Sequence, residues 1–139
     1  MGSGIAQTFA QAGYDVRLVD VAQPMLDRAR HAVESSLARF VDKGKLSAAD
    51  RDAALGRLSV GTSLDRLVPA DFVVEAIVED VDAKKALFGA LDGLIGAESV
   101  LASNTSSISI TLLGAATKRP DKVLGMHFMN PVPIMTLVE

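Results

Sequence analysis

The residue best suited to proton transfer in this sequence is a histidine near its end. His127 belongs to an apolar run over residues 122–128, and a rigid Asn-Pro-Val-Pro loop follows it. An imidazole takes and gives protons near neutral pH, so His127 could act as a general base on a hydroxyl group and as a general acid in the reverse direction. The alternative is a histidine that only completes a core or a sheet edge. The other histidine, His31, falls in the middle of a helical pattern, and we expect it to be solvated.

The opening stretch, MGSGIAQTFAQAGYDVRLVD, has glycines that run directly into a helical pattern. Gly2 and Gly4 fit the tail of a phosphate-binding turn, where glycine lets the backbone approach a pyrophosphate and the helix N-terminus offers free N–H groups. Asp20 ends the next expected strand, 18 residues after Gly2. Dinucleotide folds place a carboxylate for the adenosine ribose at an offset of about 20 residues. The alternatives are glycines in a frayed turn and an aspartate that caps a helix or a turn.

Asp20 also bears on the choice of cofactor. A carboxylate at this place repels the 2′-phosphate of NADP, and no arginine follows it directly. The pattern therefore favours NAD over NADP.

Strand and helix patterns alternate along the chain. Apolar spacing and turn residues predict strands over residues 15–20, 71–77, 99–102 and 122–128, and helices over residues 5–12, 25–41, 81–94 and 108–117, with a further helix opening at Ser47. This βαβα order predicts an α/β fold of the Rossmann-like, doubly wound kind, with a mostly parallel sheet covered by helices on both sides.

The sequence SNTSS follows the expected strand over residues 99–102. Asn104 then lies at the carboxyl end of a strand, where open α/β sheets hold their ligands, and we expect it to contact the cofactor. The alternative is that these polar residues form a helix-capping loop.

Composition narrows the classes of protein. The chain has 139 residues, of which 49% are apolar, and this suits one globular domain over residues 1–139. A net charge of −3 with scattered basic residues disfavours nucleic acid as a partner. The absence of cysteine excludes a disulfide framework and thiolate metal sites, and we expect no metal. No apolar run approaches the ~20 residues that span a bilayer, so we expect a soluble, cytoplasmic protein without membrane contact.

Four stretches give the sequence a family resemblance. They are the opening stretch, DFVVEAIVEDVDAKKALF, ASNTSSISI and GMHFMNPVPIMTLVE. With them the chain resembles, over essentially its whole length, the N-terminal NAD-binding domain of L-3-hydroxyacyl-CoA dehydrogenases, and most closely the bacterial 3-hydroxybutyryl-CoA dehydrogenases of that family.

In that family a strand and two further glycines precede the opening stretch, so Gly2 corresponds to the third glycine of GxGxxG. A helical domain follows the last stretch and forms the dimer. The resemblance therefore implies a partial domain, truncated at both ends and lacking its first strand. We expect the 139 residues alone to be inactive and to bind NAD weakly.

The resemblance also implies roles for individual residues. His127 and Glu139 correspond to the acid–base pair, and Ser106 to the serine that hydrogen-bonds the 3-oxygen of the substrate. Four more residues are implied in binding: Glu79 and Lys84 near the nicotinamide ribose, and Ser36 and Lys43 towards the CoA group. The alternatives are an ordinary chain-end glutamate, a capping loop, a solvated helix start at residues 79–84, and a polar helix end at Lys43.

The activity implied by the resemblance is NAD-dependent oxidation of (S)-3-hydroxyacyl-CoA to 3-oxoacyl-CoA and the reverse, with 3-hydroxybutyryl-CoA and acetoacetyl-CoA as substrates, in fatty acid or butanoate metabolism. The full-length protein is expected to be a homodimer. Two alternatives stay open. The chain could be the dehydrogenase segment of a multifunctional fatty-acid oxidation protein, or a non-catalytic NAD-binding structural protein. The combination of Ser106, His127 and Glu139 favours catalysis, because a protein that only binds NAD has no use for it.

Overall fold

The computed structural model describes all 139 residues and divides into two compact units. Unit 1 comprises Met1–Ser63 and Asn130–Met135, and unit 2 comprises Leu64–Met129 and Thr136–Glu139. A short segment near the end of the chain therefore packs with the first unit, although the residues on either side of it belong to the second. No helix is both long and apolar enough to cross a membrane.

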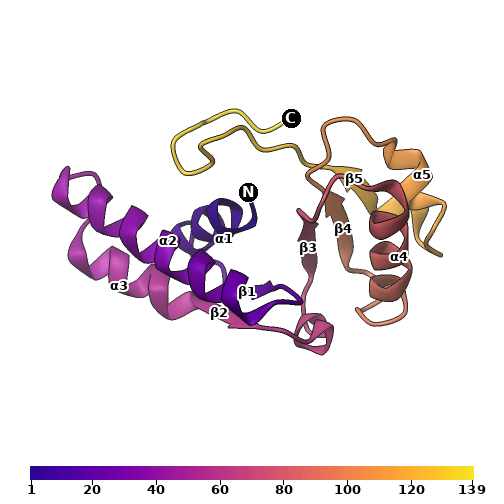
Figure 1. Cartoon of the computed structure of the whole chain (residues 1–139), viewed down its shortest axis with the longest axis horizontal. Coiled ribbons are helices and arrows are strands. Elements are labelled where there is room, and N and C mark those ends of the chain that lie inside the picture. Colours follow the sequence, from indigo (N-terminus) through magenta and orange to yellow (C-terminus); the bar gives the residue numbers. More distant parts are fainter. The chain divides into compact units, whose positions relative to one another are not determined.

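Unit 1 is a two-stranded parallel sheet with three helices. Its elements are α1 (Gly2–Gln11), β1 (Val16–Val19), α2 (Gln23–Asp42), α3 (Ala48–Arg57) and β2 (Leu58–Gly61). β1 pairs with β2 so that Val16 lies opposite Leu58. Helices α2 and α3 lie side by side as a long hairpin (Figure 1). Its core consists of small and branched side chains from the three helices and β2: Ala6, Ala10, Val33, Leu37, Ala54 and Leu58.

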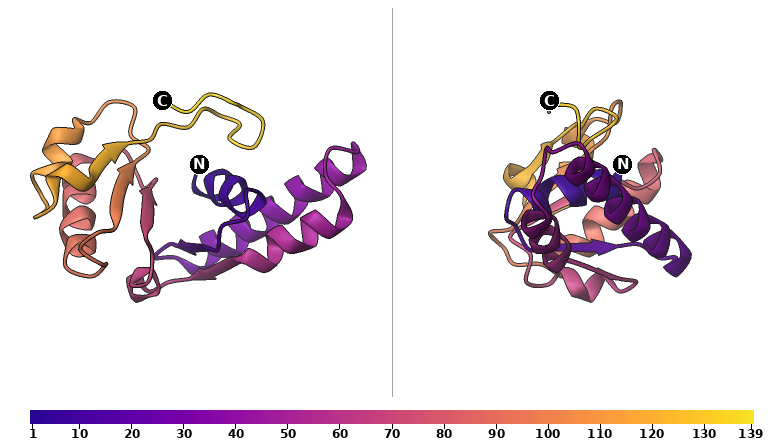
Figure 2. Two further views of the ribbon diagram at one scale, coloured as in Figure 1. Left: turned by 180° about the vertical axis from the view of Figure 1, so that it is seen from behind. Right: turned by 90° about the vertical axis from the view of Figure 1, so that its left-hand side faces the viewer.

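Unit 2 is a three-stranded parallel sheet with helices packed against it. Its elements are η1 (Leu64–Leu67), β3 (Phe72–Glu75), α4 (Val81–Asp92), β4 (Val100–Ser103), α5 (Ile110–Gly114), η2 (Pro120–Lys122) and β5 (Val123–Gly125). The strand order is β3-β4-β5, and α4 and α5 lie next to each other (Figures 1 and 2). Beyond β5, an isolated antiparallel bridge joins Phe128 to Val138.

Local sequence explains where several helices begin and end. The hydroxyl of Ser47 accepts the N–H of Asp50 at 3.0 Å, and the carboxylate of Asp80 accepts the N–H of Ala83 at 2.8 Å, so both α3 and α4 have a side-chain N-cap. Helix α2 ends before Gly44, whose φ of +69° suits glycine better than any other residue.

The C-terminal end of α4 is held by a buried arginine. Arg119 donates from Nε to Oδ1 of Asp92 at 2.7 Å, and its other nitrogens donate to the carbonyl oxygens of Asp92, Ile95, Gly96 and Ser99. The N–H of Lys118 donates to the second carboxylate oxygen of Asp92 at 2.9 Å. This backbone bond, helped by the guanidinium, lowers the pKa of Asp92 below its ordinary value and outweighs the opposite effect of burial.

The prediction of an α/β fold with parallel strands is confirmed, and its strands and helices are found within a few residues of the predicted bounds. Helices α1 and α2 are longer than predicted, since α1 begins at Gly2 and α2 covers Gln23–Asp42. Helix α5 covers only Ile110–Gly114 of residues 108–117, and β5 ends at Gly125 rather than at Phe128. β2 was not predicted, because α3 passes directly into it at Leu58 without a turn residue between them. The five strands form two separate sheets, β1-β2 and β3-β4-β5.

A pair of glycines in α1 gives a test of packing in unit 1. A Cβ added to Gly4 would lie 2.9 Å from Cβ of Val132, which is buried, whereas a Cβ on Gly2 would meet only Cδ1 of Leu18 at 3.8 Å. We expect Gly4→Ala to lower the free energy of unfolding by about 1–3 kcal/mol through overpacking. Gly2→Ala should change it by less than about 1 kcal/mol. Urea unfolding measures both, and equal effects of the two substitutions would contradict this packing.

Candidate active site

His127 and Glu139 form the centre of the candidate site in unit 2. Their backbones pair in both directions: the N–H of His127 donates to the carbonyl oxygen of Glu139 at 2.8 Å, and the N–H of Glu139 donates to that of His127 at 3.0 Å. Their side chains also meet, with Nδ1 of the imidazole 3.1 Å from Oε2 of the carboxylate. Both side chains remain accessible, at 29% and 60%.

This contact fixes the role of each imidazole nitrogen. An ionised carboxylate only accepts hydrogen bonds, so Nδ1 of His127 carries the proton that faces Glu139. Nε2 then keeps a lone pair that can take a proton from a reactant. A carboxylate in this position would stabilise an imidazolium formed at His127, as in known pairs of a catalytic histidine and a carboxylate. The structure thus brings together the two residues predicted as the acid–base pair.

Asn104 connects β4 to the segment that carries His127. Its backbone N–H donates to the carbonyl oxygen of Glu75 at 2.8 Å, and its side-chain Oδ1 accepts the N–H of Phe128 at 2.8 Å. Ser106, two residues later, is exposed and makes no hydrogen bond through its hydroxyl within the protein. Its hydroxyl is therefore available to a ligand.

A buried ion pair lies beneath this loop. Lys84 of α4 and Glu75 of β3 are each only 1% exposed at their side chains, with Nζ 2.6 Å from Oε1. The same oxygen accepts the N–H of Ile77 at 2.7 Å, and Oε2 accepts the hydroxyl of Ser103 at 2.6 Å. A buried charge pair is tolerated when further hydrogen bonds satisfy its remaining lone pairs, and this pair meets that condition.

A second carboxylate holds the next part of the loop. The hydroxyl of Thr105 donates to Oε1 of Glu79 and accepts the N–H of Ile108 at 2.9 Å. A solvated helix start is the alternative role predicted for Glu79 and Lys84. That alternative is wrong for Lys84, which is buried, while Glu79 is exposed and bonded to the loop.

Unit 1 holds the residues predicted to bind the adenosine end of the cofactor. Helix α1 begins at Gly2 without a side-chain cap, so its first N–H groups are open to an anion. Asp20 follows β1, and its Oδ1 accepts the N–H of Ala22 at 2.9 Å. Asp20 is therefore a turn aspartate, as the alternative proposed, with its second oxygen left to accept from a ribose hydroxyl. These features fit a dinucleotide.

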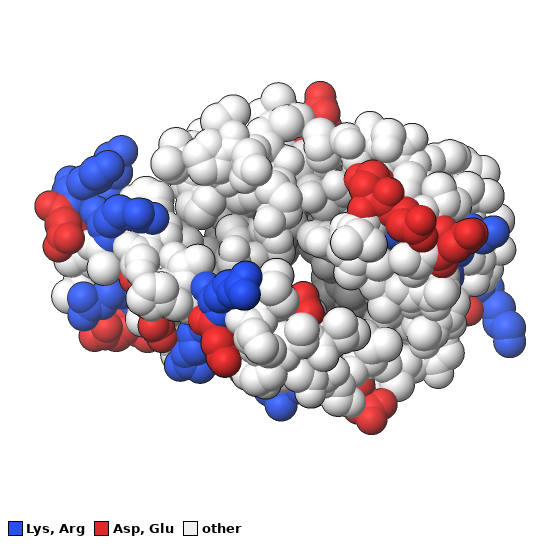
Figure 3. Space-filling model, viewed as in Figure 1, with Lys and Arg blue, Asp and Glu red and all other residues white.

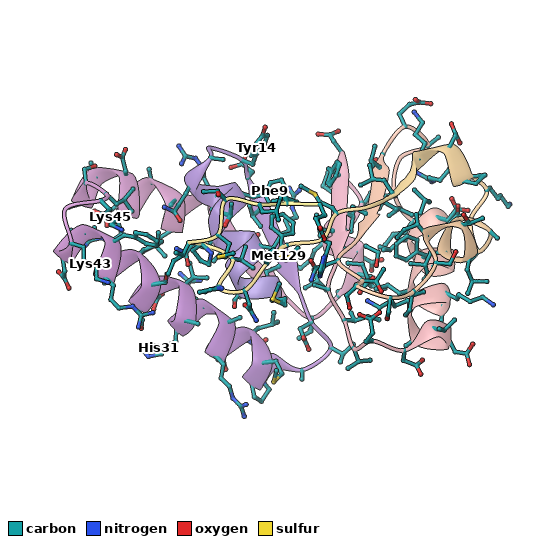
Figure 4. The ribbon with its side chains drawn as sticks, turned by 90° about the horizontal axis from the view of Figure 1, so that it is seen from above. Phe9, Tyr14, His31, Lys43, Lys45 and Met129 are labelled. Atoms are coloured by element: carbon teal, nitrogen blue, oxygen red, sulfur yellow. The ribbon has the colours of Figure 1, made fainter.

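The residues predicted to approach CoA lie on α2 of unit 1. Ser36 is half-buried, and Lys43 is exposed at the C-terminal end of the helix. Lys43 and Lys45 lie at the end of the α2–α3 hairpin, where basic and acidic side chains are interspersed (Figures 3 and 4). His31 is exposed on α2, which confirms that it is solvated. No group of three or more potential metal ligands occurs in the structure.

The sequence analysis missed Glu75, Ser103 and Thr105. The role of Glu75 could have been predicted from its place inside the apolar run DFVVEAI, because a charge within a buried strand requires a partner. Nothing in the pattern distinguished the bonded Ser103 and Thr105 from the free Ser106.

The chain is similar to known proteins over its whole length. The family model described as "3-hydroxyacyl-CoA dehydrogenase, NAD binding domain" matches residues 1–139. A 3-hydroxybutyryl-CoA dehydrogenase of Clostridioides difficile is 47% identical over 139 residues, which are 100% of this chain and 50% of that protein. A 3-hydroxyadipyl-CoA dehydrogenase of Escherichia coli is 42% identical over the same residues, which are 29% of that protein.

The fold is also similar to solved structures. The crystal structure of (S)-3-hydroxybutyryl-CoA dehydrogenase PaaH1 from Ralstonia eutropha matches with a TM-score of 0.95 and 46% identity, covering 99% of this chain and 49% of that chain. This chain therefore spans about half the length of such relatives.

The buried ion pair gives a prediction about stability. Lys84→Met leaves the Glu75 carboxylate buried without its counter-charge, and we expect the free energy of unfolding to fall by about 3–5 kcal/mol. The double variant Glu75→Gln with Lys84→Met should lose less than the sum of the two single losses, because no unpaired charge stays buried. Lys122→Met, which breaks an exposed pair with Glu98, is the control and should change little. Additive losses in urea unfolding would contradict the pairing.

Proposed function

Because this chain belongs to the 3-hydroxyacyl-CoA dehydrogenase family, we propose that it is the NAD-binding domain, over residues 1–139, of an enzyme that oxidises (S)-3-hydroxyacyl-CoA to 3-oxoacyl-CoA and catalyses the reverse. The contact of 3.1 Å between Nδ1 of His127 and Oε2 of Glu139 carries the proposal. It supplies an oriented proton acceptor, and the same unit carries the exposed hydroxyl of Ser106, which could hold the oxygen of an alcohol.

The reaction removes a proton from the 3-hydroxyl group and a hydride from C3. NAD, when bound, supplies the acceptor for the hydride. Nε2 of His127 takes the hydroxyl proton, and Glu139 stabilises the imidazolium that forms. The hydroxyl of Ser106 donates a hydrogen bond to the 3-oxygen and holds it in place. In the reverse direction the imidazolium returns the proton to the ketone oxygen.

Residues for cofactor binding are proposed in each unit by itself. In unit 1, the open start of α1 at Gly2 suits the pyrophosphate, and the second oxygen of Asp20 suits a ribose hydroxyl. A negative charge at Asp20 also disfavours a 2′-phosphate, so we propose NAD rather than NADP. In unit 2, we propose Glu79 and Lys84 for the nicotinamide ribose, while Oδ1 of Asn104 is already bonded to the N–H of Phe128. Since the ammonium of Lys84 is paired with Glu75, it acts there chiefly by fixing the surrounding loops.

For the substrate, we propose a short acyl chain such as 3-hydroxybutyryl-CoA or acetoacetyl-CoA, in fatty acid or butanoate metabolism. Relatives with similar identity are named for hydroxybutyryl and hydroxyadipyl groups, so overall identity does not separate the two acyl groups. Ser36 and Lys43 are proposed for the CoA group, where an exposed ammonium can meet a phosphate. We further propose a cytoplasmic homodimer. The His127–Glu139 contact argues against a protein that only binds NAD.

The proposed chemistry predicts a specific loss on removal of the imidazole. In the protein that carries this chain, expressed at its full natural length, we expect His127→Ala to lower kcat for acetoacetyl-CoA reduction by about 10²–10⁴, the range that general acid–base groups supply. NADH affinity should change little. His31→Ala, at an exposed histidine, is the matched control and should keep full activity. The assay follows loss of NADH absorbance, and an unchanged rate in His127→Ala would refute the assignment.

The proposed cofactor preference predicts the effect of Asp20. We expect Asp20→Ala to weaken NADH binding and to reduce the discrimination against NADPH, because the ribose loses an acceptor and the 2′-phosphate loses a repelling charge. Asp15→Ala, at an exposed aspartate just before the start of β1, should leave the affinities for NADH and NADPH unchanged. Fluorescence titration with each nucleotide measures them. If Asp20→Ala keeps the cofactor preference, the carboxylate only stabilises the turn by accepting the N–H of Ala22.

A further inference from the structure

The hydrogen-bond ladder between β4 and β5 ends just before His127. The N–H of Met126 donates to the carbonyl oxygen of Ser103 at 2.9 Å, and this is the last backbone bond that the β5 segment makes to β4. In a strand, every second residue directs its N–H to the same neighbour, so the next N–H that points towards β4 is that of Phe128.

β4 ends at Ser103 and the chain continues as the SNTSS loop, so a side chain rather than a further strand residue meets the N–H of Phe128. Oδ1 of Asn104 takes that place and accepts the N–H of Phe128 at 2.8 Å. The side chain thereby extends the strand pairing by one bond past the end of the ladder. His127 lies between the two amides that are held in this way, those of Met126 and Phe128.

Asn104 is itself firmly held. Its backbone N–H donates to the carbonyl oxygen of Glu75, and Ser103 before it is bonded through its hydroxyl to the Glu75 carboxylate. Thr105 after it is fixed through its hydroxyl to Glu79. Asn104 therefore has a rigid base from which its short side chain can fix the neighbouring segment.

We propose that Asn104 is a positioning residue for His127, acting through Oδ1 on the backbone of Phe128. This role rests on the proposed function, because it concerns the residue assigned as the acid–base group. It differs from contact with the cofactor, in which the Asn104 amide would bind a ligand directly. Misplacement of a catalytic group by about 1 Å can cost up to 10²-fold in rate, so a role of this kind has a measurable effect.

Two substitutions in the full-length protein distinguish a positioning role of Asn104 from direct contact with the cofactor. Asn104→Ala removes the acceptor, whereas Asn104→Asp keeps an acceptor oxygen at its place and replaces the NH₂ group with a second, negatively charged oxygen. We expect Asn104→Ala to speed hydrogen exchange at the Phe128 amide at least about tenfold and to lower kcat by about 10–100-fold, with NADH affinity changed less than about threefold. Asn104→Asp should keep slow exchange and retain more turnover than Asn104→Ala, each at its own pH optimum. Ser107→Ala, an exposed neighbour in the loop, is the control.

The measurements also distinguish failure of this proposal from failure of the proposed function. If the unmodified protein does not oxidise NADH with acetoacetyl-CoA, the proposed function fails, while the exchange rates still test the contact. Slow exchange at Phe128 in Asn104→Ala, or unchanged kcat, would overturn the positioning role. Loss of NADH affinity in both variants with slow exchange would assign Asn104 to the cofactor instead. If Asn104→Ala does not fold, Asn104→Leu, of similar shape but without an acceptor, takes its place.

Discussion

A carboxylate taken out of water must be surrounded by donors, and in unit 2 this requirement falls on Glu75. Its oxygens accept from the ammonium of Lys84, the N–H of Ile77 and the hydroxyl of Ser103. These donors belong to α4, to the connection after β3 and to β4. A single buried charge therefore joins the helix to the carboxyl ends of two neighbouring strands, where a parallel α/β fold places its functional loops. The arrangement is rigid because removing any one donor would leave a lone pair unmatched in a place that water does not reach.

The hydroxyl groups of the SNTSS loop differ in whether the protein already bonds them. The hydroxyls of Ser103 and Thr105 donate to the carboxylates of Glu75 and Glu79, respectively. Ser106 is exposed, and its hydroxyl is not bonded within the protein. Residues of nearly the same chemistry in one short stretch thus divide into those that fix the loop and one that can meet a ligand. The proposed function depends on this division, because a hydroxyl can hold a reacting oxygen only when no protein group already occupies it and the backbone that carries it is fixed.

Sequence reasoning succeeded where a local pattern carries its own physical cause. The spacing of α2 and the capping residue Ser47 depend on residues within a few positions of one another. It failed where the cause is tertiary. Lys84 has the pattern of a solvated helix start, and only its distance to Glu75 shows that it is buried. Arg119 lies in a polar stretch of the sequence, yet its guanidinium donates to carbonyl oxygens at the C-terminal end of α4. No local sequence pattern predicts these contacts. The pairing of His127 with Glu139 came from family resemblance alone.

That pairing also shows why the backbone, rather than attraction between side chains, sets the geometry of the candidate site. An accessible contact between a carboxylate and an imidazole contributes little free energy, since water competes for both groups. With side chains 29% and 60% exposed, His127 and Glu139 would not hold each other at 3.1 Å by charge alone. Their two mutual backbone hydrogen bonds already place the side chains next to each other, and the bridge between Phe128 and Val138 continues the pairing by one residue. The accessibility that weakens the pair as a stabilising interaction is what a proton-transfer group needs, because a reactant must reach Nε2. A backbone-held pair reconciles the two demands: the orientation is fixed without burying the groups that have to react.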